Sequence, residues 1–288
     1  MIHFNPANPR GIVWLASYPK SGNTWVRAFL HVLLRLMQAQ RVEGIDLNEV
    51  AYFGETDRAV EDYLRHVPDK KALADPATVA AARPMVQADI AMAAPGPVVV
   101  KTHNALMDYL GAPLINRRIS AGAVYLVRNP LDVAVSLAHF HAISLDDAIA
   151  RLDTEQWATR TNGEDVYFVT GSWSENVRSW TAQPSPALLT VRFEDMLERP
   201  LETFTTVAHH VAMLGSPEQI ARAIELTVFR RLQAEEAAHG FIEKPPEAER
   251  FFREGTAGQW REALSAEQVE RVVAANRAEM ARFGYLPG

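Results

Sequence analysis

Four short apolar runs, separated along the chain by helical patterns, constrain the fold more than any other feature of this sequence. The runs cover residues 12–17, 97–102, 123–128 and 186–192, and each has the length and composition of a buried strand. Helical patterns occupy residues 25–37, 131–142, 173–181 and 201–214. Buried strands that alternate with helices are typical of a largely parallel sheet. We therefore predict an α/β fold with a central, mostly parallel sheet flanked by helices.

The length of 288 residues fits one large domain or two small ones, and we expect a single domain over residues 1–288. The segment 70–95 is rich in Ala and Pro without a strand pattern, so we expect helices there. Residues 239–258 contain Pro245-Pro246, Gly255 and Gly258, which together predict a long surface loop or lid.

No targeting or membrane segment stands out in the sequence. Residues 1–10 lack the apolar core of a signal peptide. The most apolar stretch, residues 28–37, is far shorter than the ~20 residues that span a bilayer. We therefore expect a cytoplasmic protein without a membrane span.

The composition excludes several chemistries. The chain has no cysteine, which excludes a disulfide scaffold, a thiolate zinc site, an iron–sulfur cluster and a cysteine nucleophile. It has 29 Lys and Arg against 35 Asp and Glu, a net charge of −6, whereas a general polyanion binder normally shows a basic excess. We therefore expect no nucleic-acid partner.

Residues 18–25 read Tyr-Pro-Lys-Ser-Gly-Asn-Thr-Trp and follow the first strand, at the sheet edge where ligands bind in such folds. Gly22 allows a ligand to approach closely. The N–H groups of Gly22, Asn23, Thr24 and Trp25 are expected to be unpaired at the helix start. Lys20 adds a positive charge, and Ser21 and Thr24 add hydroxyl donors.

This pattern predicts a phosphate site, although an ordinary strand–helix turn with a solvated lysine has the same pattern. It is not a Walker loop, because no Gly in the chain is followed by Lys.

Residues 128–136, Arg-Asn-Pro-Leu-Asp-Val-Ala-Val-Ser, form a second motif. Arg128 and Ser136 can reach one phosphate if the Asn129-Pro130 turn reverses the chain between them. A guanidinium offers a forked pair of donors that suits phosphate. Taken alone, the motif also fits a helix start with a solvated arginine.

Together the two motifs resemble those of the cytosolic-type sulfotransferases, which use 3′-phosphoadenosine-5′-phosphosulfate (PAPS). The family pattern for the first motif is Tyr-Pro-Lys-Ser-Gly-Thr-Thr-Trp, from which only Asn23 departs. The resemblance implies a P-loop-like sulfotransferase fold in which residues 20–24 bind the 5′-phosphosulfate and Trp25 stacks on the adenine. It also implies that Arg128 and Ser136 bind the 3′-phosphate.

The resemblance extends over about residues 12–283. It implies these further nucleotide-binding residues: Phe193, Thr227, Phe229, Arg253 and Gly255. Two positions depart from the family, since Phe193 replaces a tyrosine that contacts the adenine and Glu254 replaces a lysine. The resemblance is weakest at residues 38–95, a region where the acceptor pockets of the family vary.

The catalytic candidate is His103, in the sequence Lys101-Thr102-His103 at the end of the second strand. A single histidine in a chain with nine is more often structural, but this one lies where ligands bind in parallel sheets. It also resembles the family's Lys-Thr-His, whose histidine deprotonates the acceptor hydroxyl. The resemblance implies that His103 is the general base and that Lys20 and Lys101 are catalytic cations.

We therefore expect transfer of a sulfuryl group from PAPS to an acceptor hydroxyl, or to an amine as the second choice, with PAP as the product. In-line attack places growing negative charge on the leaving phosphate oxygen, next to Lys20, while Lys101 stabilises the sulfuryl oxygens. A sulfuryl group carries less charge than a phosphoryl group, so we expect no metal.

Two other functions stay open from the sequence. A nucleotide kinase shares a strand–loop–helix phosphate site, but it needs a Walker loop and magnesium ligands, which the sequence does not show. A non-catalytic PAP- or nucleotide-binding protein on the same fold is compatible with the departures at Phe193 and Glu254.

The acceptor is the least determined part of the function. Residues 16–25 are similar to those of bacterial sulfotransferases that modify glycopeptide antibiotics, so we expect a small-molecule or natural-product acceptor. The aromatic residues that are candidates to line its site are Tyr52, Phe53, Tyr109, Phe140, Trp157 and Phe168. Residues 261–270 match the family's dimer segment only in part, and we expect a monomer or a weak homodimer.

Overall fold

A five-stranded parallel sheet forms the centre of the protein, whose computed structural model describes residues 1–2 and 10–288. The strands lie in the order β2–β3–β1–β6–β7, and every neighbouring pair is parallel. Their bounds are β1 Gly11–Ser17, β2 Glu55–Thr56, β3 Pro97–Thr102, β6 Ser120–Val127 and β7 Leu188–Arg192. Every residue of β1, the middle strand, is buried, as expected for a strand covered on both faces.

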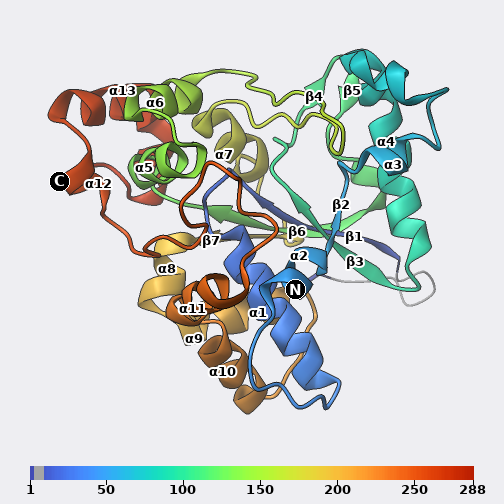
Figure 1. Cartoon of the computed structure of the whole chain (residues 1–288), viewed down its shortest axis with the longest axis horizontal. Coiled ribbons are helices and arrows are strands. Elements are labelled where there is room, and N and C mark those ends of the chain that lie inside the picture. The colour runs from blue at the N-terminus through green and yellow to red at the C-terminus, as the bar shows by residue number, and fades with distance from the viewer. Residues whose placement is uncertain (3–9) are drawn as a thin grey trace.

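Helices cover both faces of the sheet (Figure 1). The layer drawn below the sheet comprises α1 Asn23–Met37, α2 Leu47–Tyr52, α8 Phe193–Glu198, α9 Pro200–His210, α10 Pro217–Leu226 and α11 Phe229–His239. The opposite layer comprises α4 Pro76–Ala93, α5 Pro130–His141, α6 Leu145–Asp153, α7 Trp173–Thr181 and α13 Ala266–Phe283. The shorter elements are α3 Val60–Tyr63, α12 Trp260–Ala263, the 3₁₀ helices η1 Lys70–Ala74 and η2 Arg117–Ile119, and the hairpin of β4 Asp108–Tyr109 and β5 Ala112–Pro113.

Each face of the sheet has its own hydrophobic core, because successive side chains of a strand point to opposite faces. From β1, Val13 and Leu15 pack into the core with α1, α9 and α10. Trp14 and Ala16 pack into the core with α5, α6, α7 and α13. A third, smaller core joins α3 and α4 to residues 166–169.

The predicted α/β class and mostly parallel sheet are confirmed. The four predicted strands correspond to β1, β3, β6 and β7, and the segment 70–95 is helical, as η1 and α4. Strand β2 was not predicted, because two residues are too few to form a recognisable pattern. The helix predicted at 201–214 ends at His210, shortly before Ala212, whose φ of 59° is incompatible with a continuing helix.

The loop predicted at residues 239–258 lies between α11 and α12, at 240–259, and we call it the lid loop. Two carboxylates fix its C-terminal half. Glu236 on α11 accepts from the N–H groups of Phe251 and Phe252. Asp132 on α5 accepts from the N–H groups of Gly258, at 2.7 Å, and Trp260, at 3.1 Å.

Within the described ranges, no single helix is long and apolar enough to cross a bilayer; α5 and α6 taken together pass that test on length and composition, with a bend of 120° between them.

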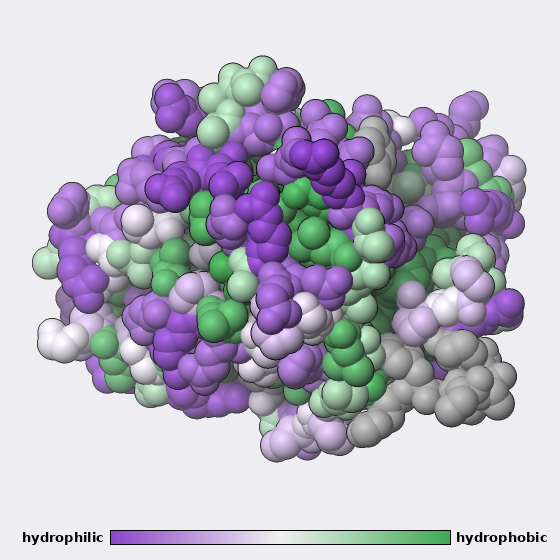
Figure 2. Space-filling view, turned by 90° about the horizontal axis from the view of Figure 1, so that it is seen from below, coloured by the Kyte–Doolittle hydropathy of each residue, from purple (hydrophilic) through white to green (hydrophobic). Residues whose placement is uncertain are grey.

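The face seen from below is mostly hydrophilic, with hydrophobic patches set among polar residues (Figure 2).

Candidate functional site

A cavity of about 590 Å³ lies at the carboxyl ends of the parallel strands. Its volume is within the range of small-molecule sites. Most of the site residues predicted from the sequence line this cavity: Lys20, Gly22, Asn23, Thr24, Trp25, Lys101, His103, Arg128, Ser136, Phe193, Phe229, Arg253 and Gly255. Ser21 lies buried behind its wall, and Thr227 is buried with its hydroxyl donating to Ala223 O at 2.7 Å.

The turn between β1 and α1 has the strained backbone of a ligand cradle. Lys20 and Gly22 both adopt positive φ, at 69° and 95°. A Cβ on Gly22 would lie 2.8 Å from Met196 Cε and 2.9 Å from Phe193 Cδ2, so only glycine fits against α8. The turn therefore depends on glycine for both its conformation and its packing.

Polar groups of this turn are left unpaired within the described residues. The N–H groups of Gly22, Asn23 and Thr24 have no partner there, whereas that of Trp25, predicted to be unpaired, donates to Gly22 O at 3.0 Å. The buried Ser21 Oγ and Arg128 Nε also lack partners among the described residues. Buried polar atoms are normally paired, so this set of donors fits the phosphates of a nucleotide.

The ammonium of Lys20 lies between two phenyl rings. Its Nζ is 3.7 Å from the ring centroid of Phe140 on α5 and 4.5 Å from that of Phe251 in the lid loop. Burial, together with the charges of Arg128 and Lys101, lowers the pKa of Lys20 to about 7. An anion bound in the turn would raise this pKa again.

His103 presents one ring nitrogen to the cavity. Its Nδ1 is 2.9 Å from the carbonyl oxygen of Ser17 at the end of β1, and because a carbonyl only accepts, Nδ1 carries the proton. Nε2 is then the unprotonated nitrogen. Burial and the charge of Lys101 lower the pKa of His103 to about 3, so the ring is neutral at pH 7.

Asn23, the departure from the family motif, supports the same corner. Its Nδ2 donates to Leu15 O at 2.9 Å and lies 3.3 Å from Ser17 Oγ. Ser17 Oγ is in turn 3.2 Å from Nδ1 of His103. The start of α1 is thus tied to the end of β1 and to the histidine.

Glu243 of the lid loop joins two cations of the cavity, and the sequence did not indicate it. Its Oε2 lies 2.7 Å from Arg27 Nη2 and 3.0 Å from Lys101 Nζ. Burial alone would raise the pKa of Glu243, but Lys101 and Arg27 lower it to about 2. Burial and Arg27 lower the pKa of Lys101 to about 8, and Glu243 partly opposes them.

The two departures at Phe193 and Glu254 both contact an arginine. The guanidinium carbon of Arg128 lies 4.2 Å from the ring centroid of Phe193. Arg128 also donates to Lys20 O at 3.1 Å and to Thr256 O at 3.0 Å. Glu254 forms an ion pair with Arg253, whose other terminal nitrogen donates to the Gln259 side chain.

Part of the cavity wall is aromatic. Three of the candidate aromatic residues line it: Phe140, which packs on Lys20, and Trp157 and Phe168, whose ring centroids lie 6.5 Å apart. Phe53 instead packs edge-on to His31, and Tyr109 packs against Tyr167 beside a separate cavity of about 460 Å³. The side chain of Tyr52 lies outside the described part of the chain.

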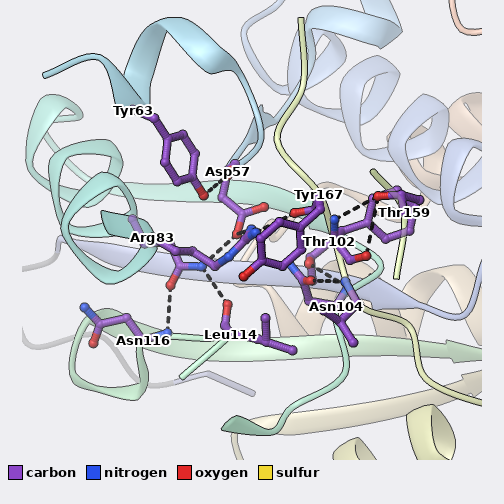
Figure 3. A network of polar contacts seen from close by, with 12 residues as sticks. Asp57, Tyr63, Arg83, Thr102, Asn104, Leu114, Asn116, Thr159 and Tyr167 are labelled. Atoms are coloured by element: carbon purple, nitrogen blue, oxygen red, sulfur yellow. Dashed lines mark hydrogen bonds and ion pairs between the residues drawn. The ribbon is translucent and has the colours of Figure 1, made fainter. Parts of the chain in front are cut away.

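A buried polar network behind this aromatic wall ties two of its segments together (Figure 3). Arg83 on α4 donates to Tyr167 O and lies 3.5 Å from the carboxylate of Asp57, and both charged side chains are fully buried. Asp57 precedes Arg58 and Tyr167 precedes Phe168, and both Arg58 and Phe168 line the cavity. The network therefore fixes their relative positions.

Of the residues that the sequence did not single out, Arg27 left the clearest signal, since a buried arginine in an otherwise apolar helix requires a partner. Arg58, Arg151 and Glu243 gave no such signal. Among residues 1–2 and 10–288, no group of three or more His, Asp or Glu side chains is arranged to hold a metal ion.

Comparison with known proteins gives a consistent result. The family model described as Sulfotransferase domain matches residues 11–284. Sulfotransferase 1A1 of Canis lupus familiaris is 25% identical over 268 residues, covering 89% of this chain and 79% of the relative. Flavonol 3-sulfotransferase of Flaveria bidentis is 22% identical over 278 residues, covering 90% and 78%.

Two solved structures share the fold. One is retinol dehydratase in complex with androsterone and the inactive cofactor PAP, with a TM-score of 0.64 and 20% identity, covering 93% of this chain and 80% of that chain. The other is mouse sulfotransferase SULT7A1 complexed with PAP, with a TM-score of 0.60 and 18% identity, covering 96% and 86%.

Proposed function

The chain belongs to the sulfotransferase domain family, and on that premise we propose that it transfers a sulfuryl group from PAPS to the hydroxyl of a small-molecule acceptor. The sulfur–oxygen bond to the 5′-phosphate breaks, a bond from sulfur to the acceptor oxygen forms, and the hydroxyl proton goes to His103. PAP is the second product.

The donor half of the cavity has the groups that this reaction needs. The unpaired N–H groups at the start of α1 and the Ser21 hydroxyl fit the 5′-phosphate. Arg128, Ser136 and Arg253 supply donors for the 3′-phosphate, and Trp25 and Phe229 supply apolar surface for the adenine. We assign Lys20 to the charge that grows on the leaving oxygen, and donors fixed in advance at such a position typically contribute ~2.7–4 kcal/mol each.

The observation that carries the proposal is the state of His103. Its proton is held on Nδ1 by Ser17, so Nε2 is free to accept the proton of an acceptor hydroxyl in the cavity that holds the anion-binding turn. A positioned base of this kind typically contributes 10²–10⁴-fold in rate. The negative charge of PAPS would raise the low pKa of this ring and make it a stronger base.

The test is transfer from radiolabelled PAPS to a panel of phenols, alcohols, glycans and peptides, with His103→Ala beside the wild type. We expect His103→Ala to abolish turnover while PAP binding, measured by calorimetry, is retained. His209→Ala, which removes an exposed histidine, serves as the control and should behave as wild type.

Wild-type-like turnover in His103→Ala would overturn the role of the base. Tight PAP binding without transfer to any acceptor would favour the non-catalytic alternative, and magnesium-dependent use of ATP would favour a nucleotide kinase.

A further inference from the structure

A continuous row of side chains leads away from the proposed base. The rings of His103 and Phe168 have centroids 6.0 Å apart, and those of Phe168 and Trp157 lie 6.5 Å apart. The guanidinium carbon of Arg151, on α6, lies 4.8 Å from the Trp157 ring centroid. All four side chains line the same cavity. The row is an aromatic surface with a histidine at one end and a cation at the other.

Arg151 differs from the other cations of this half of the cavity because no carboxylate of the described residues pairs with it. Arg27 and Lys101 share Glu243, and Arg58 pairs with Asp165 at 3.3 Å. Of the two other acids of the lining, Glu254 pairs with Arg253, and Glu55 is exposed on the edge strand β2.

The charge of Arg151 also shifts the pKa values of two side chains in the cavity wall, Tyr18 and His141. It lowers the pKa of Tyr18, opposing the larger effect of burial, and with burial it lowers the pKa of His141. Tyr18 directly follows Ser17, which holds His103. The charge of the guanidinium therefore acts inside the cavity, although the side chain itself lies at the far end of the row from His103.

We propose that the acceptor is a hydroxyaryl acid whose ring lies along Phe168 and Trp157 and whose carboxylate pairs with Arg151. The inference rests on the proposed function and names its substrate class. The Arg151 guanidinium lies over the Trp157 indole, and its forked N–H donors match the two oxygens of a carboxylate. Its position beyond Trp157 places the acid group away from His103, so the hydroxyl end of the same molecule faces Nε2.

Two features make the wall suited to selection. The buried Arg83–Asp57–Tyr167 network (Figure 3) fixes the residues that precede Arg58 and Phe168 in the chain, so the aromatic surface is formed before a ligand binds. Arg58 lies over the Phe168 ring but is paired with Asp165, so Arg151 is the cation of this surface without a carboxylate partner among the described residues. A fixed surface with one such cation rejects a molecule that lacks the matching charge more strongly than a flexible surface does.

The experiment compares Arg151→Met, Arg151→Lys and wild type. The probes are 4-hydroxybenzoate, 4-hydroxyphenylacetate and 3-(4-hydroxyphenyl)propanoate, each with its methyl ester, so that the spacing of hydroxyl and acid varies. Binding to the PAP-loaded protein is measured by calorimetry, and sulfation is measured with radiolabelled PAPS. Methionine keeps the apolar stem against Trp157, and Arg118→Met, at an exposed position, is the control.

We expect wild type to bind at least one acid about 10- to 100-fold more tightly than its ester, because charge-assisted hydrogen bonds are lost in the ester. Arg151→Met should remove that preference, Arg151→Lys should restore part of it, and ester binding should stay unchanged.

Equal binding of acid and ester by wild type at all three lengths overturns the proposal. So does an equal loss for acid and ester in Arg151→Met, or weaker PAP binding, which would assign Arg151 to the nucleotide. If acids bind through Arg151 but nothing is sulfated, the proposed function fails and the binding proposal stands. If 2-naphthol is sulfated while the affinity for the acids is the same in Arg151→Met as in wild type, only the acceptor proposal fails.

Discussion

Replacing Glu243 by Gln tests how the lid loop is held over the cavity. The carboxylate lies 2.7 Å from Arg27 Nη2 and 3.0 Å from Lys101 Nζ, and the Arg27 side chain is only 2% exposed. Glutamine keeps the shape and one oxygen acceptor but removes the charge. Two nearby cations then face each other without a shared anion, and a buried charge without its partner is strongly destabilising.

The size of the effect follows from the carboxyl pKa. Lowering it from 4.5 to about 2 corresponds to about 3 kcal/mol of stabilisation above pH 5. Because the side chain is about one-fifth exposed, little discount for solvent screening is needed. We expect Glu243→Gln to lower the free energy of unfolding by about 2–3 kcal/mol at pH 7.

The pH dependence has a defined sign. A carboxyl whose pKa is lower in the folded state contributes stability above its unfolded pKa, and that contribution falls as pH drops from 4.5 toward 2. The difference in stability between wild type and variant should therefore be constant from pH 7 to about 5.5. It should shrink by about 1 kcal/mol by pH 3.5.

Urea unfolding at pH 7, 5.5 and 3.5 provides the measurement. Glu43→Gln is the matched control, because Glu43 pairs with Arg41 on the surface, where both side chains are more than two-thirds exposed, and its loss should change stability little. A Glu243→Gln protein as stable as wild type at pH 7, or a difference that does not shrink in acid, would refute this reasoning.

Two further predictions concern the nucleotide half of the cavity. PAP binding at pH 7 should take up about half a proton at Lys20, since its pKa is about 7 in the free protein and the phosphates raise it; calorimetry in buffers of different ionisation enthalpy measures this, and Lys20→Met should lose it. Gly255→Ala should weaken PAP binding by at least about tenfold, because φ is +63° and the added Cβ would overlap the Phe229 ring. Gly96→Ala, where the Cβ meets open space, should bind as wild type, and a Gly255→Ala protein with unchanged affinity would contradict the assignment of the lid loop to the nucleotide.

The sequence predicts the sheet well because its central strands, β1 and most of β6, are buried. Residues 12–17 and 123–127 are apolar apart from Ser17, a composition typical of a strand covered on two sides. The strand β2 escapes prediction since its two residues are held by pairing with β3, which is a property of the neighbour. Local sequence patterns therefore predict the central strands of the sheet but not the edge strand β2.

The site residues likewise fall into those that the sequence predicts and those that it does not. The turn at residues 18–25 is local, and its glycine, lysine and helix start are contiguous in sequence. The Arg27–Glu243 pair joins residues 216 positions apart, and Arg151 reaches the cavity only because α6 packs beside α5. No spacing along the chain encodes such contacts, which depend on how the lid loop and helices pack.

The same packing explains how a chain of net charge −6 maintains a cationic cavity. In the free protein each central cation has a partner from the lid loop: Phe251 for Lys20, Glu243 for Lys101 and Thr256 O for Arg128. These contacts offset the repulsion by neighbouring cations that, after the larger effect of burial, lowers the pKa values of both lysines. A bound dianion would offset the same repulsion directly. Substitutions that remove the anionic partner, such as Glu243→Gln, should therefore weaken the free protein and strengthen PAP binding, opposite effects that follow from one electrostatic cause.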